Sequence, residues 1–305
     1  MENKDFLSLR DMTSETIDYL LKLASRIKRG KFLYKDLLEG KSLGLLFSKH
    51  STRTRLSFEA GINQLGGNAI YLDAQHLQLS RGETVEDTAR VLSRYLNGLV
   101  IRTYEQSMVD RFAQNSSIPI INGLTDDYHP CQALSDLFTI FEMGMLNKDL
   151  KFSYIGDSNN VSNSLLVGFS KLGLDITLGC PKEYSPKKWI IDVFNQQAKK
   201  TGARLKVAND PAEAAKDAHI IYTDVWISMG NTKSEEKLAK LKKFQVNRKL
   251  LTYASENVKV MHCLPAHREQ EITSEVMDGK NSIVWDQAEN RLHAQKALLV
   301  YLYSR

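Results

Sequence analysis

The sequence has little cysteine and lacks long apolar runs. Its three cysteines, Cys131, Cys180 and Cys263, are an odd number at wide spacing without a CxxC pair, which argues against a disulfide framework and against structural zinc. No segment approaches the roughly 20 apolar residues that span a bilayer, and the N-terminus has no apolar signal core. We therefore expect a cytoplasmic protein with no membrane partner.

Patterns typical of nucleotide and nucleic-acid binding are also missing. There is no GxGxxG after an expected strand and no GxxxxGK[ST], which are the usual nucleotide cradles. The net charge is +5, but the lysines are spread or alternate with glutamates, as in KSEEKLAKLKK at 233–243, which predicts a solvated amphipathic helix. A nucleic-acid surface would need clustered basic residues with aromatics between them, so the mild basicity favours anionic small molecules.

What the sequence does contain is an alternation of short β-branched runs with helical stretches, which restarts halfway along the 305 residues. This pattern and length predict an α/β protein of two similar-sized domains, each a mostly parallel sheet flanked by helices, joined by long helices. We expect the first domain to comprise 1–146 and 289–305, the second 147–288, because the final apolar segment must dock as a helix. The expected strands lie near 43–47, 69–72, 98–102, 118–121, 151–156, 175–179, 204–208, 219–223, 259–263 and 282–285.

One stretch, SKHSTRTRLSFEAG at 48–61, follows directly on an apolar strand pattern. Helical spacing of its apolar residues predicts a helix that begins near Ser51 or Thr52. The hydroxyls of Ser51, Thr52 and Thr54, the Arg53 guanidinium and the helix N-terminus would then converge on one point, which suits a phosphate. A capped helix with arginines in surface ion pairs is the plainer alternative, and Arg55 fits that structural role.

Other polar residues close expected strands, where ligands bind in open α/β sheets. Arg102 closes the expected strand at 98–102, and His129 and Gln132 lie in a proline-interrupted loop after the next strand. The other places hold Asp224 with Ser228 and Met229, Cys263 with Leu264, and the Asn159–Asn160 pair. Each has a plain structural alternative: a surface arginine, a packed cysteine, or an asparagine that caps a helix. His262 and His267 are five residues apart across a proline, which is not ligand spacing, so we expect no metal.

Four strings in order, FSKHSTRTRLSFE, HPCQALSD, DVWISMG and HCLPAH, resemble the characteristic motifs of the aspartate/ornithine carbamoyltransferase family over nearly the whole chain. The resemblance implies transfer of the carbamoyl group of carbamoyl phosphate to the side-chain amine of L-ornithine, giving L-citrulline and phosphate in arginine metabolism. It implies that the first domain binds carbamoyl phosphate and the second binds ornithine, without a metal or an organic cofactor.

The resemblance also assigns residues. Carbamoyl phosphate would be bound by Ser51, Thr52, Arg53, Thr54, Gln78, Arg102, His129, Gln132, Cys263, Leu264 and Arg291, and ornithine by Asn160, Asp224, Ser228 and Met229. The catalytic groups would be Arg102, His129, Cys263 and Asp224. Gln78 resembles a loop residue that enters a neighbouring subunit's site, which implies a homotrimer with sites at subunit interfaces. The Leu264–Pro265 bond is implied to be cis.

Three alternatives differ in substrate or in class. The aspartate branch of the family has HPTQ, and an HPLPR string whose arginine pairs with aspartate, where this chain has HPCQ and HCLPA. Enzymes for acetylornithine, putrescine or other amines carry altered versions of the SMG string and of the 78–84 loop. A binding protein that kept the fold and lost turnover is the third, and intact Arg53, Arg102, His129 and Cys263 argue against it.

Overall fold

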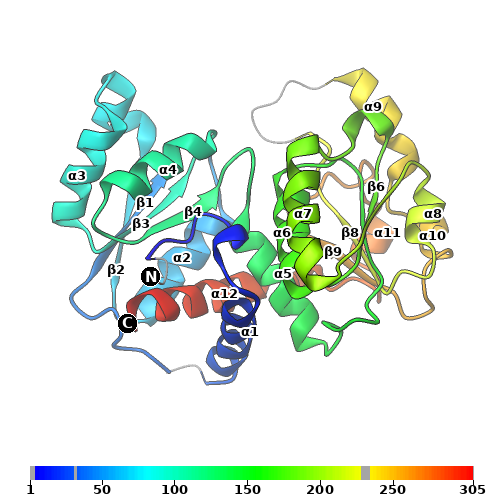
Figure 1. The fold of residues 1–305 in the computed structure, drawn as a ribbon, viewed down its shortest axis with the longest axis horizontal. Helices are drawn as coiled ribbons and strands as arrows, with labels where there is room; N and C mark the ends of the chain where they lie inside the picture. The colour runs from blue at the N-terminus through cyan, green and yellow to red at the C-terminus, as the bar shows by residue number, and fades with distance from the viewer. Residues whose placement is uncertain (1–3, 31–32, 228–233, 305) are drawn as a thin grey trace. The chain divides into compact units, whose positions relative to one another are not determined.

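The computed structural model describes residues 4–30, 33–227 and 234–304 (Figure 1). The chain divides into two compact units, Met1–Phe138 with Glu289–Arg305, and Thr139–Ala288. Both boundaries fall inside helices, α5 (Pro130–Glu142) and α12 (Val284–Tyr303). The boundary expected after residue 146 lies beyond the end of α5, whereas the two compact units divide after Phe138, within α5.

The first unit is built on a four-stranded parallel sheet in the order β2-β1-β3-β4. Its strands are β1 (Ser42–Phe47), β2 (Asn68–Asp73), β3 (Gly98–Arg102) and β4 (Ile120–Leu124). From β1 the chain adds β2 on one side and β3 on the other. The carboxyl ends of β1 and β3 therefore form a topological switch point, where open α/β sheets bind ligands.

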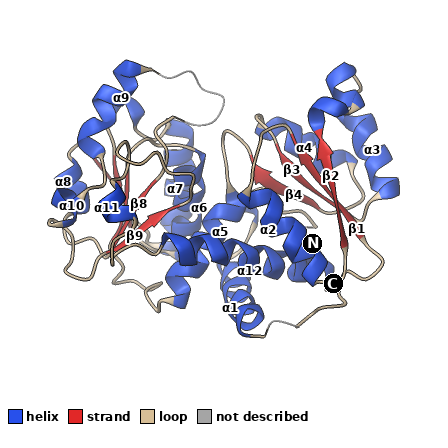
Figure 2. Cartoon of the chain, turned by 180° about the vertical axis from the view of Figure 1, so that it is seen from behind, coloured by secondary structure: helices blue, strands red, loops and turns tan. Residues whose placement is uncertain are grey.

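Helices cover both faces of this sheet (Figure 2). Leu46, Leu99 and Ile101 point to one face and pack with Val109 and Phe112 of a helix there. On the opposite face, Ser57 of one helix is hydrogen-bonded to Gln295 of α12. The helices of the unit are η1 (Leu9–Asp11), α1 (Ser14–Arg29), α2 (Arg53–Gln64), η2 (Ala74–His76), η3 (Gln78–Arg81), α3 (Val85–Tyr95), α4 (Gln106–Asn115), the first part of α5 and most of α12.

The second unit repeats the plan with a five-stranded parallel sheet in the order β7-β6-β5-β8-β9. Its strands are β5 (Phe152–Ile155), β6 (Ile176–Gly179), β7 (Leu205–Ala208), β8 (Ile220–Thr223) and β9 (Lys259–His262). The chain proceeds from β5 outward to β7, then returns to the other side of β5 for β8. The switch point of this sheet therefore lies between β5 and β8.

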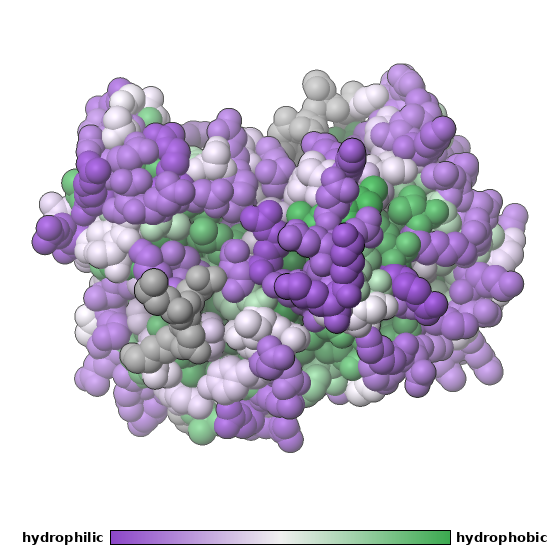
Figure 3. Space-filling model, viewed as in Figure 1, coloured by the Kyte–Doolittle hydropathy of each residue, from purple (hydrophilic) through white to green (hydrophobic). Residues whose placement is uncertain are grey.

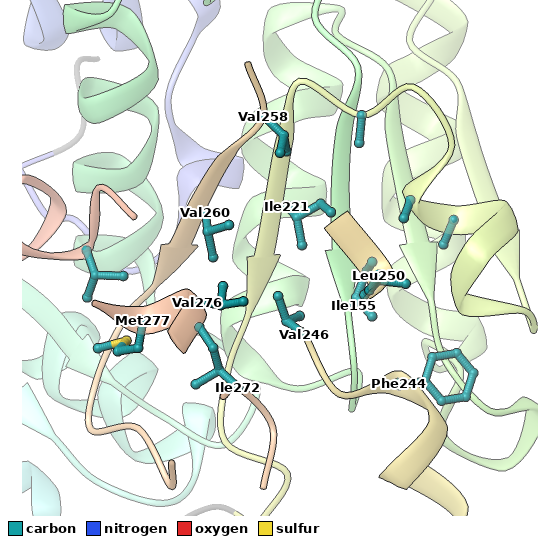
Figure 4. Packing of buried hydrophobic residues seen from close by; sticks show 14 of the residues in the cluster. Ile155, Ile221, Phe244, Val246, Leu250, Val258, Val260, Ile272, Val276 and Met277 are labelled. Atoms are coloured by element: carbon teal, nitrogen blue, oxygen red, sulfur yellow. The ribbon is translucent and has the colours of Figure 1, made fainter. Parts of the chain in front are cut away.

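Aliphatic and aromatic side chains fill the two faces of the second sheet. One face holds a hydrophobic cluster that includes Ile155, Ile221 and Val260 (Figure 4). On the other face, the ring of Phe152 lies 4.6 Å from that of Phe169. The helices are α6 (Asn160–Leu172), η4 (Lys182–Tyr184), α7 (Lys188–Thr201), α8 (Pro211–Ala215), α9 (Glu235–Leu241), η5 (Lys242–Phe244), α10 (Arg248–Leu251) and α11 (Ser274–Met277).

The strands predicted from the sequence are confirmed except for the last. The expected strand at 282–285 is wrong: Ser282 makes only an isolated bridge to Val260, and the chain enters α12 at Val284. The long helix α5 ends at Glu142, because Gly144 adopts a left-handed φ of 70° that stops the helix.

Hydrophilic residues dominate the face seen in Figure 3, with hydrophobic residues in smaller groups between them. Within the described ranges, none of the helices is both long enough and apolar enough to cross a bilayer. The expected helix at 233–243 appears as α9 followed by η5, and Leu241 is its buried contact with the core.

Candidate active site

In the first unit, candidate site residues gather where β1 and β3 end side by side. Phe47 and Arg102 are paired in the register of the two strands. The Ser48 N–H then donates a 2.8 Å hydrogen bond to the Arg102 carbonyl, which holds the loop after β1 against the end of β3. This loop leads directly into α2, so the start of α2 lies at the switch point.

The N-terminus of α2 has the composition expected of an anion site. The helix begins at Arg53 with Thr52 at the N-cap position, which confirms the predicted start. Ser51 Oγ accepts a 3.1 Å hydrogen bond from the Thr54 N–H. Amide groups of the first helical turn and the positive end of the helix dipole favour an anion at this point. Arg53 adds a full positive charge beside them.

Arg102 and His129 lie buried in the same unit, with 5% and 6% of their surfaces exposed. Burial, followed by the positive charges of Arg291, Arg102 and Arg53, lowers the pKa of His129 well below its ordinary value. His129 is therefore a neutral imidazole at pH 7. A neutral imidazole can donate an N–H to a substrate oxygen, but it has no surplus proton to act as a strong acid.

Arg291 of α12 ties three predicted residues together. Its Nη1 donates to Gln132 Oε1 at 2.6 Å and its Nη2 to Thr54 Oγ1 at 3.2 Å. Gln132 Nε2 in turn donates to Asp136 Oδ1 at 2.9 Å, and Arg291 Nε donates to Gln295 Oε1 at 2.9 Å. Asp136 therefore fixes the orientation of the Gln132 amide, with its oxygen away from Asp136 and toward Arg291.

Asp136 and Gln295 were not predicted as site residues. Asp136 lies within the HPCQALSD string, one helical turn after Gln132. The i, i+4 spacing of these two residues could have predicted their contact from the sequence. Gln295 follows Arg291 at the same spacing. Both side chains are buried and accept hydrogen bonds from the predicted site residues Gln132 and Arg291.

Two other residues of the first unit take different roles. Arg55 stacks on the Tyr71 ring at 3.9 Å from its centroid and bonds Glu59 at 2.8 Å, which confirms its structural role. Gln78 begins η3 and is exposed. Among the described residues, no hydrogen bond connects the Gln78 side chain to Ser51–Thr54.

In the second unit, candidate site residues gather at the switch point between β5 and β8. Asp224 follows β8 directly, and its Oδ2 accepts a 2.6 Å hydrogen bond from Asn159 Nδ2. Asn159 also caps α6 in a capping box, which confirms the helix-capping interpretation. Asn160 is the first residue of α6. The Asn159 contact to Asp224 was missed because capping alone accounted for that residue in the sequence.

Cys263 follows β9, the neighbour of β8, and its Sγ donates to Asp224 Oδ1 at 2.9 Å. The Leu264–Pro265 bond beyond it is cis, as the resemblance implied. The structure thus brings Asp224 and Cys263 together, with Asn160 starting the adjacent helix. The predicted ornithine ligands Ser228 and Met229 lie outside the described residues.

Asp224, His262 and Cys263 each offer a ligand atom within 4.8 Å of the others, a spacing that a metal ion would accept. However, His262 Nδ1 accepts a 2.9 Å hydrogen bond from the Leu264 N–H, and Nε2 faces Glu271 Oε1 at 3.1 Å. Both ring nitrogens are therefore used within the protein. A metal ligand needs a free imidazole lone pair, so this arrangement does not suit a metal.

A second carboxylate follows β5 near Asp224. Burial, which outweighs the hydrogen bond from Lys237, raises the pKa of Asp157 to about 6. Lys237 Nζ lies 2.7 Å from Asp157 Oδ2 and 5.0 Å from the centre of the Tyr184 ring. This cluster connects α9 to the loop between β5 and α6, although the sequence had not indicated it.

Comparisons with known proteins agree along the whole chain. The carbamoyl-P binding domain of aspartate/ornithine carbamoyltransferase matches residues 4–142, and the Asp/Orn binding domain matches residues 148–302. An ornithine carbamoyltransferase of Caldicellulosiruptor saccharolyticus is 54% identical over 304 residues, which covers 98% of each chain.

Solved structures give the same result. The ornithine carbamoyltransferase of Pyrococcus furiosus has a TM-score of 0.93 at 48% identity, covering 97% of this chain and 96% of that one. The anabolic ornithine carbamoyltransferase of Campylobacter jejuni has a TM-score of 0.93 at 39% identity, covering 98% and 99%. With both of its domain models matched and relatives of this identity at full coverage, the chain belongs to the aspartate/ornithine carbamoyltransferase family.

Proposed function

We propose that the chain transfers the carbamoyl group of carbamoyl phosphate to the side-chain amine of L-ornithine, giving L-citrulline and phosphate. The observation that supports this acceptor is the buried Asp224 carboxylate, with the Cys263 thiol 2.9 Å from it. A carboxylate at a strand end suits an acceptor that arrives as a cation. An aspartate-specific site would instead need a basic group near the turn, where Ala266 stands.

In the first unit, Ser51, Thr52 and Arg53 with the N-terminus of α2 hold the phosphate. Arg102 adds charge to the phosphate and, with Thr54 and the neutral His129, donates to the carbonyl oxygen of the substrate. These donors make the carbonyl carbon more electrophilic. They remain in place as the oxygen becomes an oxyanion, and preorganised donors of this kind are typically a large share of catalysis.

Other groups orient the carbamoyl amide. Gln132 Oε1, held toward Arg291 by the contact of its amide with Asp136, accepts from the substrate NH₂ through its second lone pair. The backbone oxygens of Cys263 and Leu264 accept from the same NH₂ group. Arg291 contributes a further positive charge at the ligand. Correct placement alone is worth about 7–11 kcal/mol in well-oriented reactions.

The acceptor is bound in the second unit by Asn160, Asp224, Ser228 and Met229. Its side-chain ammonium must lose a proton before it can attack, and the Asp224 carboxylate, beside the Cys263 thiol, accepts this proton. The neutral amine then forms a C–N bond to the carbamoyl carbon, and the C–O bond to phosphate breaks as the oxyanion collapses. The surplus proton of the nitrogen leaves with phosphate or solvent, which balances the reaction.

We also propose a cytoplasmic homotrimer in which Gln78 completes the site of a neighbouring subunit. The exposed position of Gln78 supports a site shared between subunits, and the three free cysteines support the reducing environment of the cytoplasm. Mixing unfolded Arg53→Gln and Gln78→Ala chains and refolding them tests it. Hybrid assemblies should regain activity, because some sites receive both residues intact, whereas activity no higher than that of either variant alone would reject shared sites.

The reaction is tested by measuring phosphate release from carbamoyl phosphate with and without L-ornithine, with citrulline identified by mass. Release that depends on ornithine and equals the citrulline formed supports the proposal. Binding of carbamoyl phosphate without ornithine-dependent release would indicate a binding protein instead. The Arg102→Gln variant is the matched control, because it removes a proposed donor to both the phosphate and the carbonyl.

A further inference from the structure

His262, which closes β9 immediately before Cys263, is held in one tautomer by its contacts. Its side chain is fully buried. The Leu264 N–H donates to Nδ1 at 2.9 Å, so Nδ1 carries no proton. Nε2 therefore carries the proton and donates to Glu271 Oε1 at 3.1 Å. His262 thus connects the turn after β9 to a buried carboxylate through its two ring nitrogens.

The turn itself requires support. Leu264 has a φ of 59°, a left-handed conformation that a branched side chain rarely adopts. The hydrogen bond from its N–H to His262 Nδ1 stabilises this conformation.

Glu271 binds the turn at both of its ends. Besides His262, its Oε1 accepts a hydrogen bond of 2.5 Å from the His267 N–H, and the Glu271 side chain has no exposed surface. Gln287 Oε1 accepts from the His262 N–H at 2.8 Å. Both ends of the six-residue turn 262–267 are therefore fixed to one buried carboxylate oxygen, which lies outside the turn.

We propose that His262 and Glu271 are positioning residues for carbamoyl transfer. Through the Leu264 N–H they set the direction of the Cys263 and Leu264 backbone oxygens and keep the Cys263 thiol on Asp224. Neither side chain touches the substrate. This inference rests on the proposed function, in which those two oxygens hold the carbamoyl amide.

Two substitutions of His262 separate the two bonds of its ring. His262→Asn places Oδ1 where Nδ1 stands and retains the acceptor for the Leu264 N–H. His262→Gln retains a donor that reaches Glu271 and loses that acceptor. We expect kcat per folded molecule to fall by about 100-fold in the Gln variant, the loss expected for misplaced reacting groups, and far less in the Asn variant. The KM for carbamoyl phosphate should rise in the same order.

Glu271 supplies a second pair. Glu271→Gln retains an acceptor oxygen for His262 and His267, so it should keep most of the activity, while Glu271→Met removes the acceptor at similar volume and should not. If His262→Gln does not fold, the comparison of these two Glu271 variants tests the positioning role. The matched control is His219→Gln, which removes an Nδ1 acceptor for the Lys151 N–H elsewhere in the same unit and should leave kcat unchanged.

A readout without turnover separates this inference from the proposed reaction. Cys131 and Cys180 are buried and Cys263 is half-buried, so iodoacetamide should react with Cys263 first. Release of the thiol from Asp224 should make alkylation of Cys263 about tenfold faster in His262→Gln than in wild type or His262→Asn. Wild-type kcat and alkylation rates in every folded variant, or equal losses in the Asn and Gln variants, would overturn the proposal. If wild-type protein forms no citrulline, the alkylation rates alone decide it.

Discussion

The Sγ of Cys263 donates a hydrogen bond to Oδ1 of Asp224 across 2.9 Å, and this contact joins the ends of two neighbouring strands, β8 and β9. Asp224 is further held by Asn159 Nδ2 at 2.6 Å and by the Val225 N–H at 2.8 Å. Each carboxylate oxygen therefore has a defined donor in the absence of substrate. A bound ammonium must therefore share the Asp224 oxygens with these donors.

The first prediction concerns this pair. We expect Cys263→Ser to weaken ornithine binding and lower turnover, and Asp224→Asn to do so more severely, while carbamoyl phosphate binding changes little. The side-chain amine of ornithine should titrate near the lysine value of about 10.4, so wild-type activity should rise with pH. Steady-state pH–rate profiles, corrected for the folded fraction, test this. Unshifted profiles with wild-type ornithine KM in both variants would assign both residues to packing.

The second prediction concerns Arg53 at the N-terminus of α2. Lysine carries the same charge but cannot form the two parallel hydrogen bonds that a guanidinium gives to phosphate. Arg53→Lys should therefore lose carbamoyl phosphate affinity and kcat, with a nearly unchanged thermal unfolding curve. Arg55→Lys is the matched control, since Arg55 contacts Tyr71 and Glu59 instead. Full activity of Arg53→Lys would remove this residue from the site.

The third prediction concerns the pKa of His129, which burial and then three arginines hold well below 6.5. Between the depressed folded value and 6.5, the unfolded chain binds a proton that the folded protein does not. Stability therefore falls as the pH falls below 6.5, and His129→Gln should remove part of that loss. Urea midpoints measured at pH 7.5 and 5.5 test it. An equal fall in wild type and variant would show that His129 protonates freely when folded.

The fourth prediction concerns Asp157, whose folded pKa of about 6 lies above the unfolded value of 3.8. The contribution of this group to stability is complete below the unfolded value and is lost as the pH rises through 6. Relative to wild type, Asp157→Asn should gain stability between pH 4 and 7, by about 3 kcal/mol for a shift of this size. Chemical unfolding of both proteins across this range measures the difference, and a constant difference would place the pKa near its ordinary value.

The strand ends could be located from the sequence because each follows a short apolar run. Arg102, Asp224 and Cys263 close or follow β3, β8 and β9 as predicted, since parallel strands bring such residues to one edge of a sheet. The segment at 282–285 has the same composition but starts a helix, and Trp285 is exposed. Local composition could not distinguish these outcomes, because tertiary packing decides between helix and strand for so short a run.

The supporting contacts could not be predicted in the same way. Arg291 and Gln132 are 159 positions apart, and nothing in either segment indicates which donor meets which acceptor. Asp136 and Glu271 are buried carboxylates, but their sequence positions are typical of ordinary helix and loop residues. Their roles depend on the hydrogen bonds they accept, which only the folded arrangement fixes.

We propose that this chain carbamoylates ornithine rather than another amine, and a side-by-side comparison of acceptors checks that claim. Purified protein with carbamoyl phosphate should be assayed with L-ornithine, acetylornithine, putrescine and L-aspartate, and kcat/KM determined for each. We predict a value for ornithine at least about 100-fold above the others. The site binds both ends of ornithine, so each of the other acceptors leaves some of its polar groups unpaired. An equal or higher value for another acceptor, or no citrulline from ornithine, would contradict the claim.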